Sequence, residues 1–311
     1  MKNTINYYYN ILIDDFIKSN DDYYFFLDGD EYHLLLFNRP FEDINALYKL
    51  NMQMKINGCL VHEIILNKDK QAITMVNEVP YILIKLCRYK NDKVFLNDIS
   101  YIQNMSSRLQ YDKSLFRDDW IKLWSDKIDY YEYQISQFGK KYPILCDSLS
   151  YFIGLGENAI SYLANNINSD KNNVNINLVV SHKRIKQKMG SFEFYNPINF
   201  VVDSRVRDVS EYIKNTFFND NFNIYELKSY LSLNPFNEKE YVQLFARMLF
   251  PTYYFDIYDE IINNNSSEDN ILTILNKIDD YEILLFNLYK FIVYEKKVQL
   301  EPIEWILKYH S

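Results

Sequence analysis

Two short apolar runs in the middle of the chain end in residues that could carry out chemistry. The run Leu178–His182 is followed by Lys183 and Arg184, and the run Asn199–Asp203 ends in a carboxylate. Phosphoryl transfer uses two such strands: an aspartate base stands two residues after a histidine, and a metal-binding aspartate ends the next strand. We expect the two runs to pair as antiparallel strands and to bring His182 and Asp203 to one end of a cleft between two lobes of the protein.

Most residues that this chemistry needs are missing. Arg184 stands where the base belongs, and an arginine, with a pKa above about 12, accepts no proton at neutral pH. Met189 stands at the position of the metal-binding asparagine, and residues 25–37, around the expected third strand, contain no lysine. His182 and Asp203 remain. We expect Asp203 to be a hydrogen-bonded turn residue and predict no metal site; the alternative is that this lone carboxylate binds Mg²⁺.

A basic cluster follows the first run. Because guanidinium groups match phosphate geometry, one interpretation is a site that binds an anion or a phosphorylated partner. The alternative is a solvated loop. The cluster consists of Lys183, Arg184, Lys186 and Lys188.

Further charged residues are interpreted as structural. Asp208 as N-cap, with Glu211 three residues later, resembles a capping box. Glu157 and Asn158 are expected to open a helix, where an acid favours the helix dipole; the alternative is a partner-binding motif.

Arg247 lies on an otherwise apolar helix face. A buried arginine needs a partner carboxylate. We expect an internal ion pair, with Asp208 or Asp256 as the partner.

The elements that must position these residues change character along the chain. Asp28-Gly29 between two apolar runs indicates a β-hairpin. Strands are expected at 23–27, 31–37, 59–66, 72–76 and 80–86, a helix at 41–56, and an alternative first strand near 7–13. The later spacing predicts helices at 99–109, 118–138, 147–163, 206–217, 238–250 and 269–294, with a break near Gly154 and Gly156.

This order of elements is the outline of a protein-kinase-like phosphotransferase. The predicted fold class is α+β and bilobal, with a small antiparallel β lobe and a larger helical lobe. The predicted boundaries are 1–86 for the β-rich lobe and 87–311 for the mostly helical lobe.

Composition excludes several functions. A net charge of −8 opposes nonspecific binding to nucleic acid or anionic membranes. The three cysteines are widely spaced and fit neither a disulfide framework nor a zinc site. No apolar run approaches the roughly 18 residues of a membrane span, and the N-terminal segment lacks the apolar core of a signal peptide. We therefore expect a cytoplasmic protein.

Six segments resemble the YutH-type family of spore coat-associated proteins, a kinase-like family similar in fold to aminoglycoside and choline kinases. The resemblance implies a coat or mother-cell role, and members that look unable to run the usual chemistry. This chain has Ser204-Arg205 where a His-Pro or similar pair is expected. The segments are 120–132, 150–163, 181–185, 199–214, 243–261 and 302–306.

These observations lead to one functional prediction with two alternatives. The prediction is a catalytically silent kinase-like protein without a cofactor, which binds coat or other proteins in the mother cell and then in the spore coat. One alternative is a small-molecule phosphotransferase with displaced catalytic residues. The other is a switch that binds ATP and Mg²⁺ without transfer.

Overall fold

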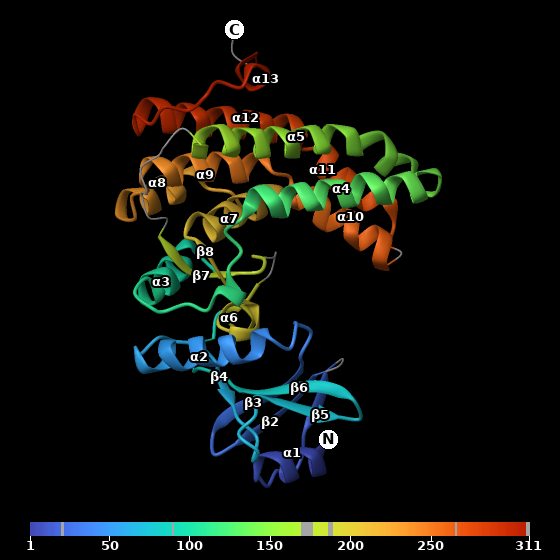
Figure 1. The fold of residues 1–311 in the computed structure, drawn as a ribbon, viewed down its shortest axis with the longest axis vertical. Helices are drawn as coiled ribbons and strands as arrows, with labels where there is room; N and C mark the ends of the chain where they lie inside the picture. Colours follow the sequence, from blue (N-terminus) through green and yellow to red (C-terminus); the bar gives the residue numbers. More distant parts are fainter. Residues whose placement is uncertain (20–21, 89, 169–176, 186–188, 265, 309–311) are drawn as a thin grey trace. The chain divides into compact units, whose positions relative to one another are not determined.

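The computed structural model describes residues 1–19, 22–88, 90–168, 177–185, 189–264 and 266–308 (Figure 1). The chain forms two compact units. The sheet unit consists of Met1–Arg117, Leu178–Arg184 and Lys188–Asp203, and the helical unit consists of Asp118–Asn177, Ile185–Gln187 and Ser204–Ser311. The division into lobes at residue 86 stays a prediction.

The sheet unit contains a six-stranded antiparallel sheet with the order β1-β2-β3-β6-β4, in which β5 also pairs with β6. Asp28 and Gly29 join β2 to β3 with φ angles of 51° and 79°. Such a two-residue turn with two positive φ angles matches the twist of a hairpin, so the predicted hairpin is confirmed. The strands are β1 Ile17–Ser19, β2 Asp22–Leu27, β3 Asp30–Leu36, β4 Glu63–Ile65, β5 Ile73–Val76 and β6 Val79–Lys85.

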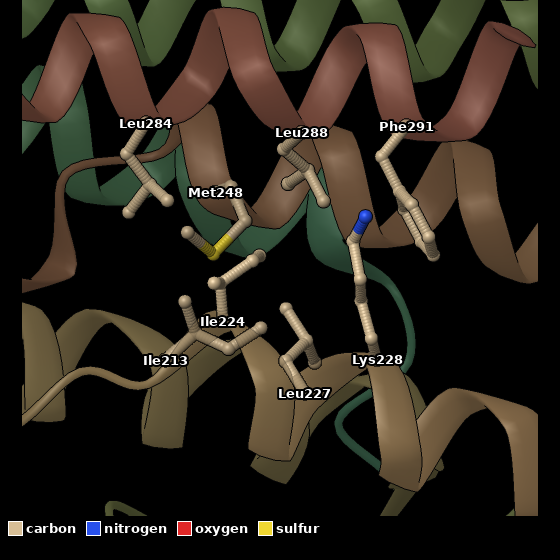
Figure 2. Close-up of a pocket in the computed structure, with 8 residues that line it drawn as sticks. All are labelled: Ile213, Ile224, Leu227, Lys228, Met248, Leu284, Leu288 and Phe291. Atoms are coloured by element: carbon tan, nitrogen blue, oxygen red, sulfur yellow. The ribbon is translucent and has the colours of Figure 1, made fainter. Parts of the chain in front are cut away.

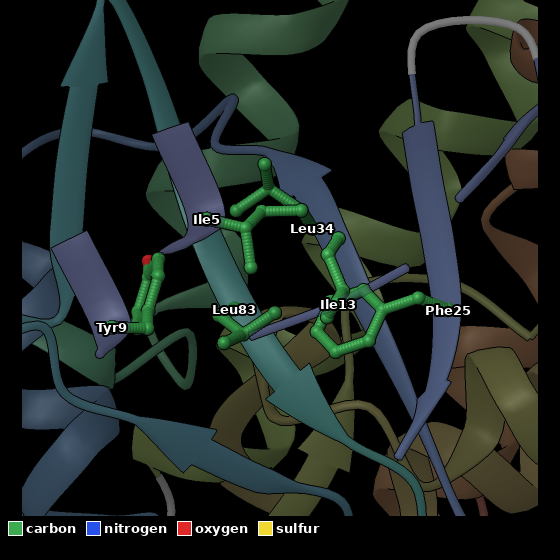
Figure 3. Packing of buried hydrophobic residues seen from close by; sticks show 6 residues of the cluster. All are labelled: Ile5, Tyr9, Ile13, Phe25, Leu34 and Leu83. Atoms are coloured by element: carbon green, nitrogen blue, oxygen red, sulfur yellow. The ribbon is translucent and has the colours of Figure 1, made fainter. Parts of the chain in front are cut away.

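A cluster of buried apolar residues joins the N-terminal helix to the sheet (Figure 3). Ile5 and Tyr9 lie four residues apart and therefore share one face of helix α1, Lys2–Tyr9. They pack in one cluster with Phe25 and Leu34 from the hairpin strands. The alternative first strand near residues 7–13 is wrong, because this segment begins within a helix and the first strand is β1.

A second, two-stranded sheet pairs β7, Leu178–His182, with β8, Phe200–Ser204. The sheet unit also contains three short elements. They are the 3₁₀ turns η1, Lys113–Leu115, and η3, Pro197–Asn199, and the one-turn helix α6, Ser191–Phe194. Two longer helices complete the sheet unit, α2 at Asp43–Ile56 and α3 at Leu96–Ser106.

The helical unit is built on α5, which packs against α4 and α9 (Figure 1). The predicted break in this helix is wrong, because α5 is continuous through both glycines. A Cβ atom on Gly156 would lie 2.6 Å from Ile128 Cδ1, so the glycine permits close packing of α4 on α5. Glu157 and Asn158 consequently lie inside α5 and do not open a helix, which corrects that prediction.

The remaining elements of the helical unit follow in chain order. They are α4 Trp120–Phe138, η2 Gly139–Lys141, α5 Pro143–Asn168, α7 Val206–Phe218, α8 Ile224–Leu233, α9 Glu238–Leu249, α10 Thr252–Asn264, η4 Glu268–Ile271, α11 Leu272–Leu275, α12 Ile278–Lys290, η5 Phe291–Glu295 and α13 Glu304–Leu307. Among the described residues, no helix is long and apolar enough to cross a membrane.

Candidate functional site

The β7–β8 pair is a hairpin, as predicted, but its ends differ from the prediction. The backbone N–H of Lys183 donates to the Asn199 carbonyl at 2.9 Å, so the end of β7 lies beside the beginning of β8. Asp203 stands four residues further along β8, roughly 13 Å away at the usual rise of a strand. His182 and Asp203 therefore lie at opposite ends of the hairpin.

His182 is a packed core residue. The residue is only 1% exposed, and its Nε2 atom lies 2.8 Å from the Phe194 carbonyl oxygen. The imidazole stacks on the Phe194 ring with centroids 4.3 Å apart. Through these contacts the His182 imidazole packs α6 against the hairpin.

Asp203 is also fully buried, at 0% exposure. Among the described residues, no group of three or more metal-ligating side chains could hold a metal ion. Lys183 and Arg184 are both partly exposed at the end of β7. Lys186 and Lys188, the rest of the predicted basic cluster, lie outside the described residues.

Residues 198–202 bind three basic residues, of which Arg39 and Arg117 were not predicted and Lys183 belongs to the predicted basic cluster. The Asn199 carbonyl accepts from Lys183, while the Ile198 and Phe200 carbonyls accept from Arg39 Nη1 at 2.9 and 2.6 Å. The Val202 carbonyl accepts from the Arg117 backbone N–H at 2.9 Å. Three cationic residues are thus anchored along five residues of chain.

Arg39 forms a buried ion pair at the beginning of α2. Its Nε and Nη2 donate to Asp43 Oδ2 at 2.9 and 2.7 Å, and the two side chains are 1% and 4% exposed. Arg117 Nη2 approaches the same carboxylate oxygen at 4.0 Å. One carboxylate therefore faces two guanidinium groups.

Lys183 belongs to this charged group. Partial burial lowers the pKa of its ammonium to about 8, and the positive charges of Arg39 and Arg117 act in the same direction against the opposing charge of Asp43. We call Arg39, Asp43, Arg117 and Lys183 the strand-edge cluster.

A separate charge network lies inside the helical unit. Glu211 Oε1 accepts from Lys214 Nζ and from Arg247 Nη2, both at 2.9 Å. Glu211 also accepts from the Thr252 hydroxyl at 3.0 Å. Arg247 forms an internal ion pair, as predicted, and one of its partners is Glu211; the expected pair with Asp208 or Asp256 stays a prediction. The guanidinium also lies 4.5 Å from the Trp120 ring centroid.

The predicted capping box at the start of α7 is wrong. Arg205 precedes the helix as its N-cap, Asp208 lies in the first turn, and Glu211 points into the buried network. The unexpected pair Ser204-Arg205 has structural partners. Arg205 binds both carboxylate oxygens of Glu240 at 2.6 Å, and the Ser204 hydroxyl donates to Gln243 at 2.7 Å.

A polar pocket of about 500 Å³ opens in the sheet unit beside the linker that follows β6. The loop before α6 is tied to this linker: Ser191 N–H donates to the Asn91 carbonyl at 2.7 Å, and Asn91 N–H donates to the Ser191 hydroxyl at 3.0 Å. The Phe192 ring lies between the His33 and His62 rings, at centroid distances of 4.7 and 5.8 Å. The volume of this pocket suits a small ligand.

The surroundings of His62 and Glu31 in this pocket lower the pKa values of both side chains. Burial lowers the pKa of His62 to about 4, so this ring is neutral at pH 7. Glu31 lies 2.9 Å from His33 Nε2 and accepts from Lys90 Nζ at 2.6 Å. Burial acts to raise the pKa of Glu31, but these hydrogen bonds hold it below its usual value.

A second cavity, in the helical unit, is a gap in packing (Figure 2). Its volume of about 10 Å³ is close to the minimum for one water molecule, and its walls are apolar. Figure 2 shows side chains of α7, α8, α9 and α12 pointing toward the same space. This cavity offers no chemistry.

The arrangement of strands and helices is that of the kinase-like phosphotransferases. An aminoglycoside phosphotransferase from Alicyclobacillus acidocaldarius has a TM-score of 0.61 at 11% identity, covering 93% of this chain and 95% of that one. A spectinomycin phosphotransferase solved with ADP and spectinomycin has a TM-score of 0.55 at 10% identity, covering 87% and 90%. The predicted fold class is confirmed.

The sequence places the chain more narrowly. A family model described as "Spore coat putative kinase YutH" matches residues 2–287, and the chain belongs to this family. The endospore coat-associated protein YutH of Bacillus subtilis (strain 168) is 28% identical over 211 residues. That match covers 61% of this chain and 61% of the relative. The predicted family is confirmed.

Proposed function

We propose that the chain is a catalytically silent kinase-like protein of the endospore coat that acts by binding other proteins. The observation that carries this proposal is the state of the catalytic positions. Arg184 replaces the base, and His182 is committed to core contacts with Phe194. Proton abstraction from a substrate hydroxyl would need a group that can accept a proton, and a guanidinium does not.

The proposed binding of partners is supported by the local positive charge of the protein and by its similarity to a coat-associated relative. Lys183 and Arg184 are partly exposed cations on a chain of net charge −8. A local positive field of this kind raises the encounter rate with acidic partners. The Bacillus subtilis relative is described as endospore coat-associated. We propose that this chain is made in the mother-cell cytoplasm and is then recruited to the coat by such partners.

The double variant Lys183→Glu/Arg184→Glu tests recruitment. We expect a fluorescent fusion of this variant to remain diffuse in the mother cell during sporulation, whereas the wild type collects on the forespore. The control Lys18→Glu/Arg88→Glu makes the same charge change at other positions of the sheet unit. Thermal melting should differ little between the variants, because partly exposed charges usually change stability by about 0.5 kcal/mol. Normal recruitment of the first variant would contradict a binding role for these two residues.

A further inference from the structure

The polar pocket beside the linker after β6 is negatively charged. Its described lining residues supply three carboxylates against one ammonium group. One of its two imidazoles, that of His62, is neutral at pH 7, and the other can add at most one positive charge. The carboxylates therefore outnumber the cations in either case, so the pocket attracts positively charged ligands and repels phosphate groups. The carboxylate, ammonium and imidazole groups belong to Glu31, Asp92, Glu193, Lys90, His33 and His62.

Glu31 already binds an ammonium group in this pocket. Its side chain is 17% exposed, Oε1 lies 2.9 Å from His33 Nε2, and Oε2 accepts from Lys90 Nζ at 2.6 Å. The Lys90 side chain, by contrast, is 71% exposed. An ion pair with so exposed a lysine contributes little, because solvent screens the charge and the long side chain loses freedom when it is held. A ligand ammonium group can therefore take the place of Lys90 on a carboxylate that is already oriented.

Phe192 forms an aromatic wall of the pocket, and His62 fixes its position. The Cys87 backbone N–H donates to His62 Nδ1 at 3.1 Å, so Nε2 carries the proton and donates to the Phe192 carbonyl at 3.0 Å. His33 connects this wall to the carboxylate, because its ring contacts Glu31 and has its centroid 4.7 Å from that of Phe192. An aromatic face near a carboxylate suits an alkyl chain that ends in a cation.

We infer that this pocket binds an alkylammonium group, which pairs with Glu31 in place of Lys90 and packs its carbon chain against Phe192. The volume of about 500 Å³ is within the range of pockets for small ligands. Two sources present this chemistry, a free aliphatic amine and the lysine side chain of another protein. The inference is independent of the proposed recruitment to the coat, which rests on Lys183 and Arg184.

Isothermal titration calorimetry on the full chain tests the inference with three probes. Putrescine represents the free amine, N-acetyl-lysine amide represents a lysine side chain, and butanediol is the uncharged analogue of putrescine. We expect at least one of the two amines to bind and butanediol not to bind. Binding of putrescine alone would assign the pocket to a free amine, and binding of the lysine derivative alone would assign it to a partner protein.

Two variants of the pocket should change the affinity for the amine in opposite directions. Glu31→Gln removes the carboxylate and should weaken binding about tenfold, because a charge-assisted hydrogen bond is lost. Lys90→Met removes the competing ammonium group and should strengthen binding about threefold, since Glu31 is then open to the ligand. The control Glu63→Gln removes a carboxylate of β4 whose side chain is 37% exposed, and the affinity should stay unchanged.

Three results would overturn the inference. The first is that neither amine binds the wild type or Lys90→Met, or that butanediol binds as tightly as putrescine. The second is amine binding that is unchanged in Glu31→Gln or weaker in Lys90→Met. Because Lys90 is exposed, its variant should fold normally and tests the site even if Glu31→Gln unfolds. The third is binding of ADP that weakens in Lys90→Met without any binding of the amines, which would assign the pocket to a nucleotide.

Discussion

Replacing Arg39 with methionine is expected to lower the free energy of unfolding by about 3–5 kcal/mol. The substitution keeps much of the side-chain volume but leaves the Asp43 carboxylate, 4% exposed, without its close partner. It also leaves the Ile198 and Phe200 carbonyls without the guanidinium donor. An unpaired buried acceptor costs about 1–3 kcal/mol, so several penalties act together.

Urea unfolding followed by circular dichroism measures this effect. Lys55→Met is the matched control, because Lys55 pairs with Glu63 at 2.9 Å but both side chains are more than a third exposed. Such surface pairs contribute about 0–1 kcal/mol. The double variant Arg39→Met/Asp43→Leu removes the unpaired carboxylate and should recover part of the loss. Equal stability of Arg39→Met and Lys55→Met would show that the ion pair does not hold the sheet unit.

Glu211→Gln should destabilise the helical unit by a similar amount, about 3–5 kcal/mol. Glu211 is the carboxylate shared by Lys214 and Arg247, whose side chains are 2% and 3% exposed. The neutral amide can still accept a hydrogen bond from one cation, but it supplies no charge to either. Lys214 and Arg247, both buried, would then lose the counter-charge that Glu211 supplies.

Thermal and urea unfolding of Glu211→Gln check this expectation, with Glu295→Gln as the control. Glu295 pairs with Lys228 at 2.9 Å, and those side chains are 54% and 42% exposed. Adding Lys214→Met to Glu211→Gln removes one of the two buried charges and should restore part of the stability. A Glu211→Gln protein as stable as the control would mean that the cations are neutralised by other groups.

The sequence predicted elements whose signal is local. Asp28-Gly29 between two apolar runs predicted the β2–β3 hairpin, because two positive φ angles in a row select such residues. The hairpin of β7 and β8 was predicted from two buried runs. The break in α5 was not correct, because a glycine in a helix can serve close packing, as Gly156 does against Ile128.

The candidate site depends on partners that are distant in the sequence. The i, i+4 spacing of Arg39 and Asp43 was visible, but the carbonyls that fix Arg39 come 159 and 161 residues later. Arg247 was correctly expected to need a carboxylate, and Glu211, which the sequence did not single out as its partner, supplies one. The sequence indicates that a buried charge needs a partner, but it does not identify which residue that partner is.

Turnover of ATP tests most directly whether the protein is catalytically silent. The purified chain is incubated with ATP and Mg²⁺ and with water, a small alcohol or an aminoglycoside as acceptor, and ADP release is compared with that of Asp203→Ala. We predict equal, background-level release from both proteins, because Arg184 offers no base. ADP release by the wild type that disappears in Asp203→Ala would contradict it.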